Sequence, residues 1–247
     1  MKRFLFLFLL TSQAAMSQTP DSVQAPGIPP KSDFRFGVLS EMGYQLAYLS
    51  LPNVRSFLQQ NQIEAMTRFD PFVHLNVGMR YYRLKLMAQN GFGVDLFARN
   101  DQKGSVAQRN SASYSAVALG YDVINGRNNR LYVNAGVGSI FYDYSAYNRT
   151  SQPVSFQNVA QYSQPGDIPS LRLTNTYWDI SLEFSQREKR KSSVASVLRV
   201  GYRRGLQAEA WKWGMFELTG GPSDRISQVY FQAGFYLSSN YTKGAKR

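Results

Sequence analysis

Two runs of alternating apolar and polar residues, joined by a charged turn, constrain this chain more than any other part of its sequence. In residues 171–185 the apolar positions recur at every second residue: Trp178, Ile180, Leu182 and Phe184. After the turn at 187–192, residues 194–207 repeat the pattern with Leu198, Val200 and Tyr202. Side chains of a strand point alternately to opposite faces of a sheet. The stretch therefore predicts a β-hairpin with one apolar face and one largely polar face.

The polar faces of this hairpin carry opposite charges. Asp179 and Glu183 lie on the first run, and Arg199 and Arg203 lie on the second. In a soluble sheet such a face would meet water, whereas complementary charges on neighbouring strands indicate that the polar faces enclose one another. An apolar outer face with a polar interior is typical of a membrane β-barrel, with lipid outside and a polar lumen.

The N-terminus has the pattern of a cleaved secretory signal peptide, residues 1–17. Basic residues at 2 and 3 precede an apolar run at 4–10, and small residues at 15 and 17 suit cleavage after Ser17. The run is too short to cross a bilayer as a helix, which needs about 20 apolar residues. The chain contains no cysteine, so it is neither a disulfide framework nor a cysteine-anchored lipoprotein.

Composition agrees with a barrel better than with a helical membrane protein or a nucleic-acid-binding protein. Mean hydropathy is −0.35, too low for a bundle of membrane helices. Aromatic residues make up 14% of the chain, which suits the interfacial girdles of a membrane barrel. The formal net charge is +12, but an exported protein does not meet nucleic acid, so we expect no such partner.

Eight segments have the alternation of a strand: 34–49, 72–81, 84–97, 114–124, 131–143, 171–185, 194–207 and 226–237. Val54, Phe57 and Leu58 have helical spacing, which predicts a short helix within 53–66 that packs on the barrel rim. Residues 18–33 contain four prolines, and we expect them to form an extended leader. The predicted domains are thus the signal at 1–17, the leader at 18–33, a barrel at 34–238 and a basic tail at 239–247.

The connections between these segments alternate between long and short. Those after the first, third, fifth and seventh strands are long, and those after the second, fourth and sixth are short. Short periplasmic turns and long external loops are typical of outer-membrane barrels, and an even number of strands closes an antiparallel sheet without an edge. The sequence predicts an all-β fold, an eight-stranded antiparallel up-and-down transmembrane barrel.

The pattern over 34–237 resembles the small eight-stranded outer-membrane barrels of the outer-membrane protein A and X type from Gram-negative bacteria. It includes the phrases Leu119-Gly120-Tyr121-Asp122-Val123 and Val200-Gly201-Tyr202-Arg203. The resemblance implies an outer-membrane location, contact with lipopolysaccharide and phospholipid, and insertion by the barrel-assembly machinery. It also implies external loops that bind an unknown ligand. Such barrels commonly end on an aromatic residue, whereas here Phe235 and Tyr236 precede a polar tail.

We expect the charged residues on the polar faces to form a network in the lumen, centred on Glu41, Asp179, Glu183, Arg199 and Arg203. Asp95, Asp122, Arg35, Arg80 and Lys85 share these faces. An eight-stranded barrel is only wide enough for side chains to fill, and buried charges must be paired, so we expect a lumen plugged by salt bridges. Pairing around the 187–192 turn predicts that Arg199 lies opposite Ser181 or Asp179, within reach of Asp179 and sometimes of Glu183.

Two other functions are compatible with this architecture. The single histidine, His74, is expected near the external end of its strand, where some barrels that resemble this one modify lipid A with a His, a Ser and an acidic residue. A narrow pore is the other alternative. No zinc spacing, phosphate-binding glycine loop or nucleophile elbow is present, so we predict a non-enzymatic surface protein without a cofactor.

Basic residues gather at the predicted periplasmic turns: Arg83, Arg127, Arg130, Arg187, Lys189, Arg190 and Lys191. Three more lie in the tail, Lys243, Lys246 and Arg247. Such residues are either simply solvated or attracted to anionic phospholipid headgroups, where each contributes about 1 kcal/mol. The sequence does not separate these two interpretations.

Overall fold

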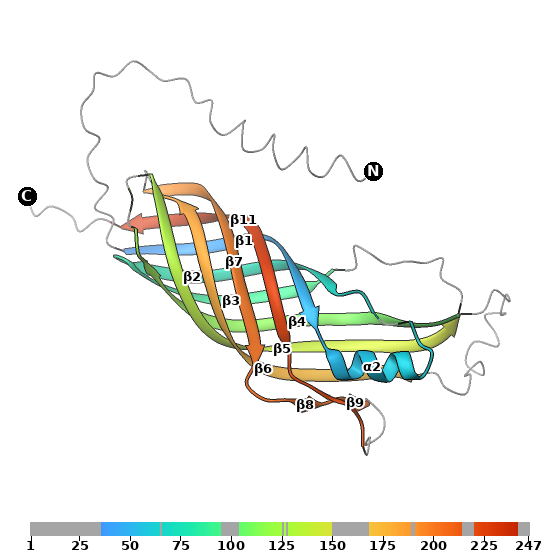
Figure 1. Cartoon of the computed structure of the whole chain (residues 1–247). Coiled ribbons are helices and arrows are strands. Elements are labelled where there is room, and N and C mark those ends of the chain that lie inside the picture. Colours follow the sequence, from blue (N-terminus) through green and yellow to red (C-terminus); the bar gives the residue numbers. More distant parts are fainter. Residues whose placement is uncertain are drawn as a thin grey trace, which may run out of the picture. The chain divides into compact units, whose positions relative to one another are not determined.

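Eight long strands close into an antiparallel barrel in the computed structural model of the chain (Figure 1). The structure describes residues 36–64, 66–94, 104–124, 126, 128–149, 168–188, 191–213 and 220–241. The predicted signal peptide, the leader, Arg35, Asp95, Arg127, Lys189, Arg190 and tail residues 242–247 lie outside them.

The barrel strands are β1 (Phe36–Ser50), β2 (Phe69–Tyr81), β3 (Leu84–Gly93), β4 (Gly104–Asp122), β5 (Asn129–Arg149), β6 (Ile168–Gln186), β7 (Ser192–Gly205) and β11 (Ser227–Tyr241). Each pairs with the next along the chain, and β1 pairs with β11 to close the sheet. The external connections contain helix α2 (Pro52–Gln60) and the short strands β8 (Glu209–Ala210), β9 (Lys212–Trp213) and β10 (Ser223–Asp224). The predicted eight-stranded barrel with short periplasmic turns and long external loops is confirmed. Among the described residues no helix is long and apolar enough to span a membrane.

The outer surface of the barrel carries an apolar band between two rings of aromatic side chains. Within the band, residues such as Val77, Leu182 and Val200 are more than half exposed, because they face lipid. The external ring contains the ring pairs Tyr48–Phe69 and Trp178–Tyr202, with centroids 5.6 and 5.5 Å apart. The periplasmic ring contains Phe36, Tyr81, Tyr82 and Tyr241. Two aromatic girdles around an apolar band are the signature of a barrel that spans the outer membrane.

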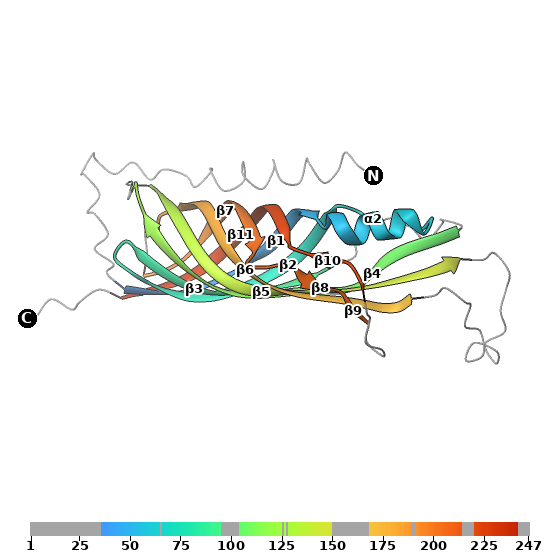
Figure 2. The same cartoon turned by 60° about the horizontal axis from the view of Figure 1, so that its bottom comes forward.

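β4, β5 and β6 extend further on the external side than the sequence predicts. β4 begins at Gly104, within the segment predicted to be a polar loop, β5 continues to Arg149, and β6 begins at Ile168. Figure 2 shows these strands running past the ends of their neighbours and alongside α2. The predicted helix is present but ends at Gln60 rather than at residue 66.

Candidate functional site

The middle of the lumen holds four charged side chains that are each at most 3% exposed: Glu41, Lys85, Glu183 and Arg199. The Nη2 atom of Arg199 lies 2.6 Å from Glu183 Oε2 and 3.1 Å from Glu41 Oε2. Lys85 forms an ion pair with the other oxygen of Glu183. These two carboxylates and two cations, which we call the central layer, balance one another. Such pairing offsets the cost of burying their charges.

The predicted pairing of Arg199 is wrong by two to four residues. Arg199 on β7 lies opposite Glu183 on β6, and Asp179 lies opposite Arg203. A shift of a strand by two residues leaves every side chain on the same face and changes only its partners. The alternation of apolar residues therefore specified the faces of the hairpin but not its register.

Arg203 and Asp179 form a second group nearer the external end, the external layer. Arg203 Nε lies 2.9 Å from Asp179 Oδ2, and its Nη2 donates to Gln45 Oε1 at 3.0 Å. The guanidinium also stacks on the rings of Tyr114 and Tyr230, whose centroids are 4.0 and 4.3 Å away. Glycines opposite these rings make room for them, because a Cβ at Gly91 would overlap Tyr114 and one at Gly201 would overlap Tyr230. Aromatic rings and ion pairs thus occupy this part of the lumen together.

A third group, the periplasmic layer, closes around Glu188, which comes from the turn after β6. Its carboxylate pairs with Arg80 of β2 and with Arg130 of β5, whose Nε is 3.2 Å away. Arg130 Nη1 also lies 3.0 Å from Asp122 Oδ2. Burial raises the pKa of Glu188, but the charges of Arg80 and Arg130 outweigh burial and hold that pKa below its usual value.

The basic turn residues divide between lumen and solvent. Arg130, predicted to lie in a solvated turn, is only 3% exposed and points inward, because it is the second residue of β5. Arg83 and Lys191 are exposed, and Arg187 is half-buried and donates to the carbonyl of Gly126. Glu188 was missed as a lumen residue, because the alternation of a strand does not say where a turn residue points.

A small cavity separates the central and periplasmic layers. Its volume is about 10 Å³, and its walls include Glu41, Lys85, Glu183, Ser185 and Glu188. Ser185 Oγ is buried there and makes no hydrogen bond within the described residues. A space of this size holds about one water molecule, and the polar walls suit one.

His74 lies in the middle of the barrel and not near the external end of its strand. It faces Gly43 across β1 and β2 and is 0% exposed. Its Nε2 atom lies 3.4 Å from Glu41 Oε1 and 3.0 Å from Gln232 Nε2. A residue acting on lipid at the outer rim would have to be accessible there, so this position does not fit the predicted alternative role. Within the described part of the chain, no group of His, Asp and Glu could hold a metal ion.

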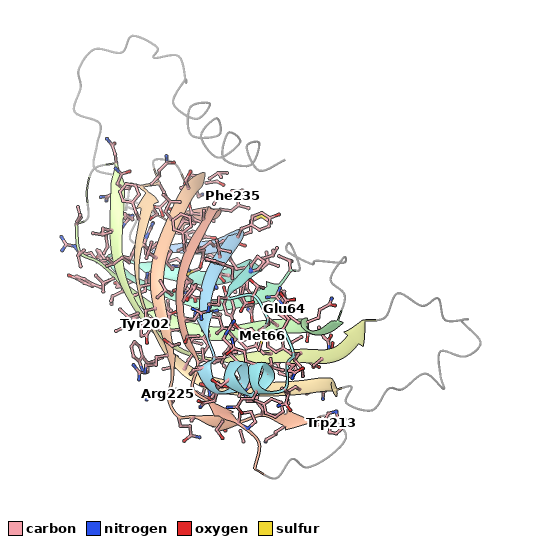
Figure 3. The ribbon with its side chains drawn as sticks, turned by 45° about the vertical axis from the view of Figure 1, so that its right-hand side comes forward. Glu64, Met66, Tyr202, Trp213, Arg225 and Phe235 are labelled. Atoms are coloured by element: carbon pink, nitrogen blue, oxygen red, sulfur yellow. The ribbon has the colours of Figure 1, made fainter. Side chains whose placement is uncertain are left out.

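Above the apolar band, α2 covers an apolar core, which we call the external cap. Its buried members include Val54, Leu58, Met66, Phe72, Tyr142, Tyr144, Leu171, Leu173, Trp211 and Ile226. In Figure 3 Met66 lies beside α2, over the extended strands. An ion pair of Arg109 Nη1 with Asp70 Oδ1, 2.8 Å long, lies at the base of this core.

Asp224 of β10 holds α2 in place. Its carboxylate accepts hydrogen bonds from the backbone N–H groups of Asn53 and Val54, at 2.9 and 2.8 Å, and from the indole Nε1 of Trp211 at 2.8 Å. The first N–H groups of a helix lack partners within the helix, so a carboxylate at this position caps it. No sequence pattern indicates this cap, because Asp224 is about 170 residues from the helix.

The closed sheet, the apolar band and the polar lumen define an eight-stranded β-barrel protein of the bacterial outer membrane. No protein-family model matches the chain, and no curated protein matches it in sequence.

Several solved structures are similar to the barrel. Neisserial surface protein A is 11% identical and has a TM-score of 0.45, with 82% of this chain and 96% of that one covered. OprG from Pseudomonas aeruginosa is 12% identical with a TM-score of 0.41, covering 82% and 95%. Ail from Yersinia pestis is 11% identical with a TM-score of 0.40, covering 81% and 97%. At these values the likeness carries no information about what this chain binds.

Proposed function

We propose that the protein is a closed, non-enzymatic barrel that anchors a binding surface on the outside of the cell. The observation that carries this proposal is the stack of three charged layers along the lumen. In each layer arginine side chains meet carboxylates, and the central layer also contains a lysine. An eight-stranded barrel has room for little else, and the cavity between two of the layers fits about one water molecule. Ions would have to break several buried pairs to pass.

The external cap supports the surface role. It has an apolar core of its own, and its helix is capped by a carboxylate from a distant segment, so it is built as an ordered structure. β4, β5 and β6 extend as strands beyond the apolar band on the external side. Rigid elements that carry loops outward are a common arrangement for binding. The partner we propose is an external ligand of unidentified chemistry. We also propose that the barrel-assembly machinery inserts the barrel into the membrane.

Conductance measurements test the closed lumen. Purified protein in planar bilayers should show little steady conductance, because the layers of ion pairs leave no continuous path. A variant that removes the central cation, Arg199→Ala, serves as a comparison in the same bilayers, provided that it still shows the heat-modifiable gel mobility of a folded barrel. Large, stable, ion-selective channels from the unaltered protein would reject the closed lumen in favour of a narrow pore.

A lipid profile tests the absence of enzymatic activity. Cells with and without the gene should contain lipid A with the same acylation pattern, because the single histidine is buried in mid-lumen. A change in acylation that disappears in a His74→Ala variant would replace the proposal with a lipid-modifying enzyme.

A further inference from the structure

Two groups of arginines within the described residues differ in their partners. Those that point into the lumen are paired with carboxylates: Arg80, Arg130, Arg199 and Arg203. Three others are exposed at the external edge of the apolar band: Arg68, Arg204 and Arg225. Within the described part of the chain, no ion pair joins any of these three to a carboxylate. Because these three side chains are exposed, a partner outside the protein can reach them.

Arg204 and Arg225 lie next to each other on the barrel wall. Arg204 on β7 is opposite Ser227 on β11, two residues beyond Arg225. Arg225 Nε donates to the carbonyl of Gly205 at 2.6 Å, which brings its guanidinium beside the residue that follows Arg204. In Figure 3, Phe235, Tyr202 and Arg225 follow one another along the flank of the barrel towards the end that carries α2.

The surface around these two arginines changes from apolar to polar in a short distance. Arg204 is opposite Trp178 on β6, and Trp178 packs against Tyr202 in the external aromatic ring. Below this ring, Ile180 and Val200 face lipid. Above it, Thr174 and Thr176 of β6 are exposed on the same face. From the apolar band towards the external side, the side chains on the wall are thus first aliphatic, then aromatic, and then hydroxyl and guanidinium groups.

Arg68 extends the same surface around the barrel. Its Nη1 atom donates to the hydroxyl of Tyr48 at 2.6 Å, which places it at the external aromatic ring. Tyr48 of β1 lies opposite Val229 of β11, so this arginine is separated from Arg204 by two strands. We call Arg68, Arg204 and Arg225 the arginine belt.

We propose that the arginine belt binds the phosphate groups of a phosphorylated glycolipid in the outer leaflet. The acyl chains would continue along the apolar band, the sugar would meet the hydroxyls of Thr174 and Thr176, and the phosphates would meet the guanidiniums. Charge complementarity and continuity with the lipid-facing band select this occupant, because a soluble anion would not need the aromatic ring below. Guanidinium groups also match phosphate geometry well.

Lipid binding to the purified full chain in neutral detergent tests this assignment, with bound lipid counted by native mass spectrometry. The probe is bisphosphorylated lipid A, compared with its dephosphorylated form and with phosphatidylglycerol. Each arginine near a charged lipid surface contributes about 1 kcal/mol, which is about a fivefold change in affinity. We therefore expect the double variant Arg204→Gln with Arg225→Gln to bind lipid A about 25-fold more weakly, close to the binding of dephosphorylated lipid.

Arg83→Gln is the matched control, because Arg83 is an exposed arginine in the turn at the opposite end of the barrel. Its affinity for lipid A should equal that of the unaltered protein. Unchanged binding by the double variant, or an equal loss in Arg83→Gln, would overturn the site. Equal affinity for phosphatidylglycerol with the same dependence on Arg204 and Arg225 would overturn the assignment to a glycolipid. The result does not depend on whether the lumen conducts, so this proposal and the closed lumen fail separately.

Discussion

The lower and upper parts of β6 have opposite patterns of polarity. In the lower part, Glu183 points inward and is buried, while Leu182 faces outward and is 55% exposed. In the upper part, Leu173 points inward and is fully buried, while Arg172 faces outward and is exposed. The same strand thus exchanges its polar and apolar faces along its length.

The surroundings of the strand explain this exchange. In the membrane the outer face meets hydrocarbon and the inner face meets the lumen, so the apolar residues are outside. Above the membrane the outer face meets water, and the apolar residues must be buried inside. β5 follows the same rule, with Asn134 buried and Val133 exposed below, and Tyr144 buried above. The position at which the faces exchange therefore marks the membrane boundary.

Removing the central cation of the lower region should have the largest effect. Arg199→Leu leaves Glu41 buried without its closest charge partner, whereas Glu183 keeps Lys85. Breaking a buried pair from one side costs about 3–5 kcal/mol. The variant should lose its heat-modifiable gel mobility at a clearly lower temperature. Adding Glu41→Gln should recover much of the loss, and an unaltered transition in Arg199→Leu would show that the lumen charges do not stabilise the barrel.

Arginine substitutions on the outer face of β6 should locate the boundary. Leu182→Arg places a charge in hydrocarbon and should destabilise the inserted barrel by about 2–4 kcal/mol if it lies near the midplane. Thr174→Arg, on the same face of the same strand but above the aromatic ring, should cost at most about 1 kcal/mol. Equilibrium unfolding in urea from lipid vesicles measures both. Equal costs would mean that the two positions share one environment and that the boundary is elsewhere.

The exchange of faces also explains which features the sequence could predict. The alternation of apolar and polar residues predicts the number of strands and the faces of residues such as Leu182 and Glu183. It does so because the outer face meets hydrocarbon and the inner face meets the lumen along the whole membrane span. This rule does not hold above the boundary, so the alternation does not predict the upper parts of β4 and β5 as strands. Register was open to error, since a slip of two residues keeps the faces of Arg199 and Glu183. Glu188 and Asp224 lie outside the long strands, and only the folded chain brings them to their partners.

In the upper region, removing the helix cap should have a smaller and local effect. Asp224→Ala takes the acceptor from the N–H groups of Asn53 and Val54, and loss of a cap costs about 0.5–2 kcal/mol. Hydrogen exchange at these two amides should accelerate, while the heat-modifiable mobility of the barrel stays unchanged. Asp143→Ala is the control, because Asp143 bonds to Arg172 and Ser170 rather than to α2. A change in the barrel transition would show that the cap and the barrel unfold as one unit.

The smallest expected effect is a response to acid, which should separate the charged lumen from the apolar cap. Glu188 has a pKa held below its usual value in the folded protein, since the charges of Arg80 and Arg130 outweigh the opposing effect of burial. Its contribution to stability is therefore fully present above the unfolded pKa, about 4.3 for Glu, and is lost as the pH falls below that value towards the folded pKa. The apolar core of the cap does not include Glu188, so it should not respond to the titration of that residue.

A Glu188→Gln variant makes this measurable. Near neutral pH the amide of Arg187, which bonds to the carbonyl of Asn128, should exchange faster in the variant than in the unaltered protein. As the pH falls from about 4.3 through the lowered folded pKa, the two proteins should converge, because protonation then removes the charge that the substitution removes. The amide of Val54 in the cap should exchange equally in both proteins at every pH. If the difference at Arg187 persisted in acid, Glu188 would hold the turn through its shape and hydrogen bonds rather than through its charge. The periplasmic layer would then depend on packing, as the cap does, rather than on ion pairs.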